Sequence, residues 1–116
     1  PELLPQRVHF ETGKAKIRSA FRKEIQAVCE HMQQNSGQRI RVLGHADETG
    51  SAASNTRLAA RRASIVTEFM IEHCALPAER LEIRAFGATK RVCTESSKEC
   101  RQQNRRVAFE VLDAQE

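Results

Sequence analysis

Two oppositely charged residues, Asp47 and Arg62, are the strongest candidates for binding chemistry in this chain of 116 residues. Arg62 interrupts the apolar stripe of a predicted helix, four residues after Leu58 and four before Val66. Residues four apart lie on one helical face, and a guanidinium there must extend to solvent or meet an anion, because an unpaired buried charge is unfavourable. Asp47 lies shortly before this helix and is the candidate partner of Arg62 within the chain.

The pair admits two interpretations. In the structural one, Asp47 and Arg62 form an ion pair where a loop meets the helix. In the functional one, they bind the two charges of an amino-acid zwitterion: Asp47 receives the ammonium group, and the planar fork of Arg62 holds both oxygens of the carboxylate. Asn55, seven residues before Arg62 on the same helical face, would add neutral hydrogen bonds to the ligand.

Periodic patterns of apolar residues indicate the elements that must position these side chains. Alternation predicts strands, and steps of three and four predict amphipathic helices. The predicted strands cover residues 7–10, 39–45, 81–87 and 106–112, and the predicted helices run from Ile17 to the terminator at 35–37 and from about Ser51 to His73. Residues 88–104 are predicted to form a long polar connection. The order β-α-β-α-β-β predicts an α+β fold with two helices on one face of a four-stranded mixed sheet.

Composition narrows the class of protein further. With 40% hydrophobic residues, 116 residues can form one core, and no run approaches the ~20 apolar residues of a transmembrane helix. The net charge of +4 raises nucleic acid as a partner, but the cations are spread along the chain, and the aromatic residues are five Phe with no Trp or Tyr. Single-strand binding needs several exposed rings, so we expect a mildly basic solvated surface and no nucleic-acid partner.

Signals for catalysis or a metal site do not stand out. The sequence contains no GxSxG motif, no nucleophile–histidine pair and no carboxylate dyad with an evident role. The four histidines are scattered, and the four cysteines form no CxxC pair, so we expect neither an enzyme nor a bound metal or cofactor. An even number of cysteines, with Cys93 and Cys100 bracketing a short polar stretch, favours an oxidising compartment.

Several spaced motifs resemble those of OmpA-like carboxy-terminal domains. The heptapeptide GHADETG at 44–50, then Asn55, then LAARRA at 58–63 resembles the family's peptidoglycan-binding motif, which reads GHTDxxG, Asn and LSxxRA. VHF at 8–10 followed by ETGKA resembles the family's first strand and turn, the strand ending at Gly87 has a counterpart, and NRRV at 104–107 resembles the start of the last strand. The resemblance covers about residues 7–112.

The resemblance implies a non-catalytic module that binds peptidoglycan. Asp47 and Arg62 would grip the diaminopimelate of the stem peptide, Asn55 and Leu58 would lie between them, and the positions of Phe10 and Glu11 would line the same pocket. The module would tether the cell envelope to the wall. The alternative is a protein-interaction module of an envelope complex with weak or regulated wall binding.

The same resemblance implies a periplasmic location, in a soluble domain of an outer-membrane-associated protein. Its partners would be peptidoglycan and other envelope proteins, and it would meet a membrane only through an amino-terminal anchor. Because the chain begins at Pro1 rather than Met, we expect a single domain, residues 1–116 with a core of about 7–112, excised from a longer envelope protein.

Two positions depart from the family pattern, and the cysteines add an expectation. Ala46 replaces the usual Thr and Ala59 the usual Ser, so both positions lose a hydroxyl group while the two charges remain. Some family members carry a disulfide in the loop of Cys93 and Cys100, and closing this loop would contribute roughly 2–3 kcal/mol. Cys29 and Cys74 fall on the two predicted helices, which pack on one face of the sheet, so a second bridge between them can form.

Overall fold

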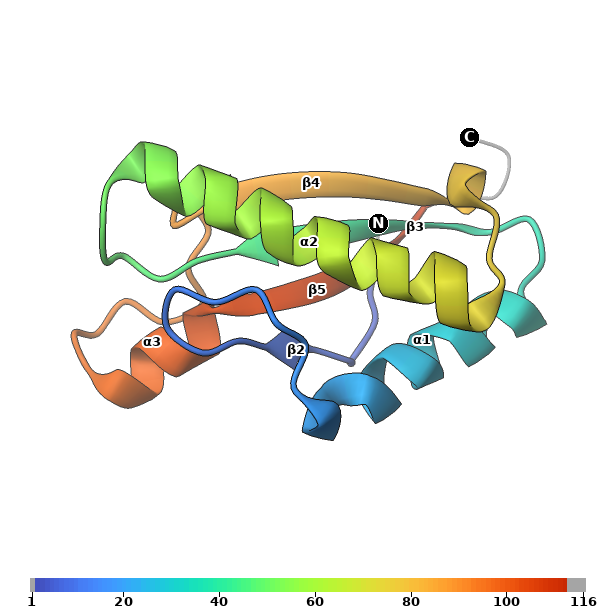
Figure 1. Ribbon diagram of the computed structural model, residues 1–116, viewed down its shortest axis with the longest axis horizontal. Coiled ribbons are helices and arrows are strands. Elements are labelled where there is room, and N and C mark those ends of the chain that lie inside the picture. Colours follow the sequence, from blue (N-terminus) through green and yellow to red (C-terminus); the bar gives the residue numbers. More distant parts are fainter. Residues whose placement is uncertain (1, 113–116) are drawn as a thin grey trace.

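The computed structural model describes residues 2–112, and it confirms an α+β fold in which helices cover one face of a mixed sheet (Figure 1). Within these residues there are one five-stranded sheet and three α-helices. In chain order these are β1 (Glu2–Leu3), β2 (Val8–His9), α1 (Arg22–Gln34), β3 (Arg39–His45), α2 (Ala52–Cys74), β4 (Leu81–Gly87), α3 (Lys98–Asn104) and β5 (Arg106–Leu112). Short 3-10 helices at Ser19–Phe21 and Ala78–Arg80 precede α1 and β4.

The strand order places the loop after β3 beside the start of α2. The sheet runs β1-β5-β3-β4, with β2 also paired to β5. β3 is parallel to β4 and antiparallel to β5, so the β3–α2–β4 connection is a crossover and must leave from the carboxyl end of β3. Asp47 follows this end directly, and the parallel pairing brings Gly87 of β4 opposite His45.

The core fills the space between the two long helices and the sheet. Figure 1 shows α2 running along β3 and β4, with α1 beside it. Ile40, Val42 and Phe109 point from the sheet into this layer and are fully buried, where they pack with the apolar stripes of α1 and α2. Neither α1 nor α2 covers the other face of the sheet, where strand alternation places polar and charged residues.

Gly44 allows α2 to lie directly on β3. A Cβ atom at this position would lie 2.0 Å from the carbonyl oxygen of Ala59 and 3.2 Å from the Cβ of Ala63. Both alanines are fully buried. The small residues at 44, 59 and 63 therefore allow α2 to lie close to β3 at this point.

Three details differ from the prediction. The first helix begins at Arg22 rather than near Ile17, because a 3-10 turn precedes it. The predicted polar connection contains α3, whose first turn is capped by Ser97: its hydroxyl oxygen accepts from the Cys100 N–H at 3.1 Å. The strand β1 is additional, so the sheet has five strands where four were predicted.

The expected Cys93–Cys100 bridge is present, and Cys29 and Cys74, whose pairing the sequence left open, are also disulfide-bonded. Cys29–Cys74 joins α1 to the end of α2, and Cys93–Cys100 joins the loop after β4 to α3. No helix within residues 2–112 combines the length and the hydropathy needed to cross a membrane.

Candidate functional site

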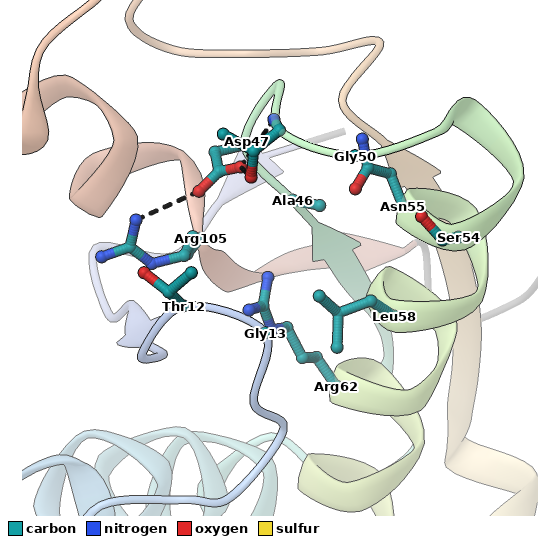
Figure 2. Close-up of a pocket in the computed structure, with 11 residues that line it drawn as sticks. Thr12, Gly13, Ala46, Asp47, Gly50, Ser54, Asn55, Leu58, Arg62 and Arg105 are labelled. Atoms are coloured by element: carbon teal, nitrogen blue, oxygen red, sulfur yellow. Dashed lines mark hydrogen bonds and ion pairs between the residues drawn. The ribbon is translucent and has the colours of Figure 1, made fainter.

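The pocket that contains Asp47 and Arg62 lies at the carboxyl end of β3, between α2 and the loop after β2 (Figure 2). Its volume is about 350 Å³. The structure brings four of the predicted site residues, Asp47, Asn55, Leu58 and Arg62, around this one cavity. The full lining is Thr12, Gly13, Ala46, Asp47, Thr49, Gly50, Ser54, Asn55, Leu58, Arg62 and Arg105.

The carboxylate of Asp47 is held by the loop that follows it and by one arginine. Oδ1 accepts from the backbone N–H of Thr49 at 2.9 Å and from the Thr49 hydroxyl, and Oδ2 accepts from Nη1 of Arg105 at 3.1 Å. Burial alone would raise the pKa of Asp47, but the hydrogen bonds from Thr49 and Arg105 outweigh it and hold this pKa below its ordinary value. Asp47 is therefore ionised at neutral pH.

The partner of Asp47 is Arg105, so the interpretation that paired Asp47 with Arg62 is wrong. Figure 2 shows the guanidinium of Arg105 directed at the Asp47 carboxylate, while that of Arg62 lies below, beside Gly13. Arg105 immediately precedes β5, which lies next to β3 in the sheet. It reaches Asp47 from the position just before the neighbouring strand, whereas Arg62 points from α2 toward the loop after β2.

The guanidinium of Arg62 is fully buried and bound to three backbone carbonyls. Nε donates to Lys14 at 2.8 Å, Nη1 to His45 at 3.0 Å and Nη2 to Glu11 at 3.2 Å. Within residues 2–112 no carboxylate pairs with it. Of the five N–H groups of an arginine, these contacts leave one on each Nη without an acceptor among the described residues.

Burial and neighbouring charge act together on Arg62. Burial is the main cause and the charge of Arg105 adds to it; against the opposing effect of the Asp47 carboxylate, together they lower the pKa of Arg62 to about 10. The side chain is still a cation at neutral pH. Among the described residues its guanidinium bonds to carbonyl groups and to no carboxylate, so the pocket offers a cation without an ion-pair partner next to an anion that already has one.

Phe10 and Glu11 support Arg62 and do not line the pocket. The Phe10 ring is fully buried, with its centroid 5.2 Å from Cζ of Arg62, a cation–π distance. Glu11 contributes its carbonyl to Arg62, and its carboxylate points to solvent, 3.6 Å from Nζ of Lys14. The next two residues, Thr12 and Gly13, take the lining positions instead.

Helix α2 supplies the other wall of the pocket. Its first turn is capped by Ser51, whose hydroxyl accepts from the Ser54 N–H at 3.1 Å. Asn55 and Leu58 then face the cavity (Figure 2). Within the described residues the side-chain amide of Asn55 makes no hydrogen bond, and Leu58 is the large apolar side chain of the lining. Ala46 adds a small apolar contact where the family pattern has Thr.

The loop of Asp47 is tied down on two further sides. The Ala46 N–H donates to the Gly87 carbonyl at 2.8 Å, which fixes the loop to the end of β4. Glu48 accepts from Nε of Arg101 on α3 at 2.8 Å. His45 contributes only its carbonyl, to Arg62; its ring lies on the opposite face of the sheet and does not brace the loop. Within the part of the chain that is described, no group of three or more His, Cys, Asp and Glu residues could hold a metal ion.

Comparison with known proteins identifies the family of this domain. The structure is an α+β domain with a charged pocket at the carboxyl end of a central strand. Residues 9–105 match the model of the OmpA family, and the chain belongs to this family. The family resemblance predicted from the motifs is thus confirmed.

Two relatives match most of this chain, and both are longer proteins. The chain is 33% identical over 101 residues to outer membrane protein Omp38 of Acinetobacter baumannii, covering 87% of this chain and 28% of Omp38. It is 32% identical over 101 residues to the peptidoglycan-associated lipoprotein of Agrobacterium fabrum, covering 87% of this chain and 56% of that protein. The chain therefore spans less than two thirds of either relative.

Solved structures share the fold. The peptidoglycan-associated lipoprotein of Burkholderia pseudomallei superposes with a TM-score of 0.86 at 20% identity, over 92% of this chain and 90% of that one. The carboxy-terminal domain of Helicobacter pylori MotB gives a TM-score of 0.84 at 24% identity, over 93% of this chain and 84% of that one.

Proposed function

We propose that this domain binds peptidoglycan without cleaving it, by gripping the zwitterionic centre of diaminopimelate between Asp47 and Arg62. One observation carries the proposal: a fully buried arginine with no carboxylate partner in the described residues shares a pocket with an ionised aspartate. Membership of the OmpA family and the names of its relatives, one an outer membrane protein and one a peptidoglycan-associated lipoprotein, support it. The domain would then be periplasmic and would tether the envelope to the wall.

Each contact in the proposed complex follows from an unused bonding position. The free N–H groups on Nη1 and Nη2 of Arg62 would bind the two oxygens of the ligand carboxylate. Oδ2 of Asp47 accepts one hydrogen bond, from Arg105, and retains a lone pair for an ammonium N–H. The Asn55 amide would bond to the peptide backbone of the stem, and Leu58 would pack on the aliphatic chain of the ligand.

The pocket lacks the groups that would make it catalytic. Its hydroxyl groups come from Thr12, Thr49 and Ser54, and its lining contains no histidine or cysteine and one carboxylate, Asp47. That carboxylate accepts from the Thr49 hydroxyl and from Arg105, and its pKa is held below the ordinary value, which makes it a weak base. A hydroxyl nucleophile needs a neighbouring base able to take its proton, so binding is the chemistry that this lining supports.

Co-sedimentation with purified diaminopimelate-type peptidoglycan tests the proposal. Replacing Arg62 by Ala would leave the carbonyls of Glu11, Lys14 and His45 without their donor, so loss of binding would be confounded with unfolding. Arg62→Lys keeps the charge but removes the fork. Arg61→Lys, at an exposed position one residue away, is the matched control, and Asp47→Asn removes the anion without changing the shape.

We expect the wild type and R61K to sediment with the wall, and D47N and R62K to bind at least about ten-fold more weakly, equivalent to about 1.4 kcal/mol. Free meso-diaminopimelate should compete with the wild type. Circular dichroism verifies the fold of each variant. Equal sedimentation of all four proteins, or equal binding to a wall whose stem peptide carries lysine instead, would refute the assigned site.

A further inference from the structure

A second pocket lies on the face of the sheet that α1 and α2 leave uncovered. Its volume is also about 350 Å³. Strand alternation places its residues on the opposite side from the core: Leu43 and His45 on β3, Phe86 on β4, and Arg106 and Ala108 on β5. We call this cavity the open-face pocket.

The open-face pocket concentrates positive charge. Five cationic side chains and one carboxylate line it. The net charge of this lining is therefore +4, the same as the net charge of the whole chain. At one end the charges are paired: Arg41 binds Glu82 at 2.8 Å and Glu110 at 3.0 Å, and Arg84 lies 3.7 Å from Glu82. The excess charge is therefore at the other end.

At that other end, Arg7, Lys90 and Arg106 have no carboxylate partner within residues 2–112. Arg7 donates to the carbonyls of Leu4 and Gln6, and Arg106 to those of Asn104 and Lys90 at 3.3 and 3.2 Å. The Nζ of Lys90 lies 4.6 Å from the centroid of the Phe86 ring. These three residues form a cationic cluster that has no counter-charge among residues 2–112.

The three cations of the cluster all lie close enough to His45 to affect its pKa. Its ring stacks on Phe86 at 5.3 Å, and its Nδ1 is buried without a hydrogen-bond partner among the described residues, as is Nε of Arg106. Burial lowers the pKa of His45 to about 3, and the charges of Arg106, Arg7 and Lys90 contribute to this shift. His45 is thus a neutral, aromatic part of the pocket wall beside the cationic cluster.

The rim of the pocket is held in place by Asn104. This residue is fully buried; its Oδ1 accepts from the N–H groups of Val92 and Cys93 at 2.9 and 3.1 Å, and its Nδ2 donates to the Cys93 carbonyl at 2.7 Å. The Cys93–Cys100 disulfide closes the same loop onto α3. The segment that carries Lys90 and the exposed Val92 is therefore fixed before any ligand arrives, which reduces the entropy lost on binding.

We propose that the open-face pocket binds a carboxylate presented next to an apolar side chain, as in an acidic segment of a partner protein. The cationic cluster would bind the carboxylate, and Leu43, Phe86 and Val92 would contact the apolar group. Glu82 and Glu110 lie on the same face and interrupt its positive surface, which disfavours an extended polyanion such as nucleic acid or an anionic bilayer and favours one discrete acidic group. This proposal does not depend on wall binding by Asp47 and Arg62.

The test is an NMR titration of the ¹⁵N-labelled domain with the peptide acetyl-Leu-Asp-Leu-amide, and with acetyl-Leu-Asn-Leu-amide as the neutral counterpart. We expect saturable shifts at the amides of Leu43, His45, Phe86, Lys90 and Arg106 for the aspartate peptide, with Kd on the order of 1 mM. The asparagine peptide should give at least about five-fold weaker binding, and added salt should weaken the aspartate peptide.

Matched variants separate this pocket from other basic surfaces. K90M should weaken binding of the aspartate peptide at least about five-fold, whereas K16M, at an exposed position in the loop before α1, should not change it. D47N should lose the wall and retain the peptide. Equal shifts with the two peptides, shifts confined to the Asp47 pocket, or no effect of K90M would overturn the proposal. Binding to phosphatidylglycerol vesicles without binding to the peptide would overturn it in favour of a membrane-facing surface.

Discussion

Acid should destabilise this domain through His45, and the size of the effect follows from burial. The side chain is 4% exposed, and burial together with the nearby cations lowers its pKa to about 3 from an ordinary value of 6.5. Between these two values the unfolded chain binds a proton that the folded chain does not. Stability therefore rises with pH across this window and is lost as the pH falls below 6.5.

We expect the contribution of His45 to lower the free energy of unfolding by about 2 kcal/mol from pH 7.5 to pH 5. This figure is set by the ordinary pKa of His45 in the unfolded chain, because pH 5 lies well above the folded value of about 3. The substitution His45→Phe removes the titrating group and keeps a ring on Phe86. The difference between the two pH profiles isolates the contribution of His45 from that of all other groups.

Urea unfolding at pH 7.5, 6.5, 5.5 and 5.0 measures the effect on both proteins. We expect the wild-type free energy of unfolding to fall by about 2 kcal/mol more than that of H45F over this range. NMR titration of the imidazole provides a direct check. Parallel profiles for the two proteins, or an imidazole midpoint near 6.5 in the folded state, would show that His45 is not desolvated and would refute the reasoning.

Three further changes test the packing that positions the two pockets. Asn104→Ala removes three buried hydrogen bonds to the 92–93 backbone and should lower the free energy of unfolding by roughly 2–4 kcal/mol in urea, while exposed Gln103→Ala should change it little; equal effects would mean that the loop does not depend on Asn104. Gly44→Ala puts a methyl group 2.0 Å from the Ala59 carbonyl oxygen and should destabilise by on the order of 3 kcal/mol in thermal unfolding, and a neutral result would show that α2 can lift from the sheet. Replacing Cys29 and Cys74 by Ala should lower the free energy of unfolding by up to about 4 kcal/mol, and replacing Cys93 and Cys100 by roughly 2.5 kcal/mol. The first bridge costs more to lose because it closes a 45-residue separation and the second a 7-residue one. The reverse order in denaturant midpoints would contradict the chain-entropy account.

Elements with a clear period could be predicted from the sequence. The alternation of β3, β4 and β5 and the stripe of α2 extend over seven or more residues, so local pattern and burial agree. β1 has two residues and exists through its pairing with Val111 and Glu110 at the far end of the chain. Helix α3 is short and polar, and it depends on the Ser97 cap and the disulfide at Cys100 rather than on an apolar stripe.

The same distinction applies to the site. Asp47, Asn55, Leu58 and Arg62 come from one loop and one helix, so their spacing in the sequence already places them near each other. Arg105 was missed as the partner of Asp47 because the two are 58 residues apart and meet only through the pairing of β5 with β3. The signal was present in the consecutive arginines of the NRRV motif, since neighbouring residues at a strand must face opposite sides.

Because these two arginines are consecutive, the register of β5 decides which arginine side chain enters each of the two pockets. Arg105 points to the Asp47 pocket and Arg106 to the open-face pocket, while Val107 lies opposite Gly44 on β3 and Val8 on β2. A one-residue shift in the register of β5 would turn both side chains to the opposite face, along with every apolar residue that follows. Both pockets therefore depend on the same register of β5, and a change of that register cannot alter one pocket without altering the other.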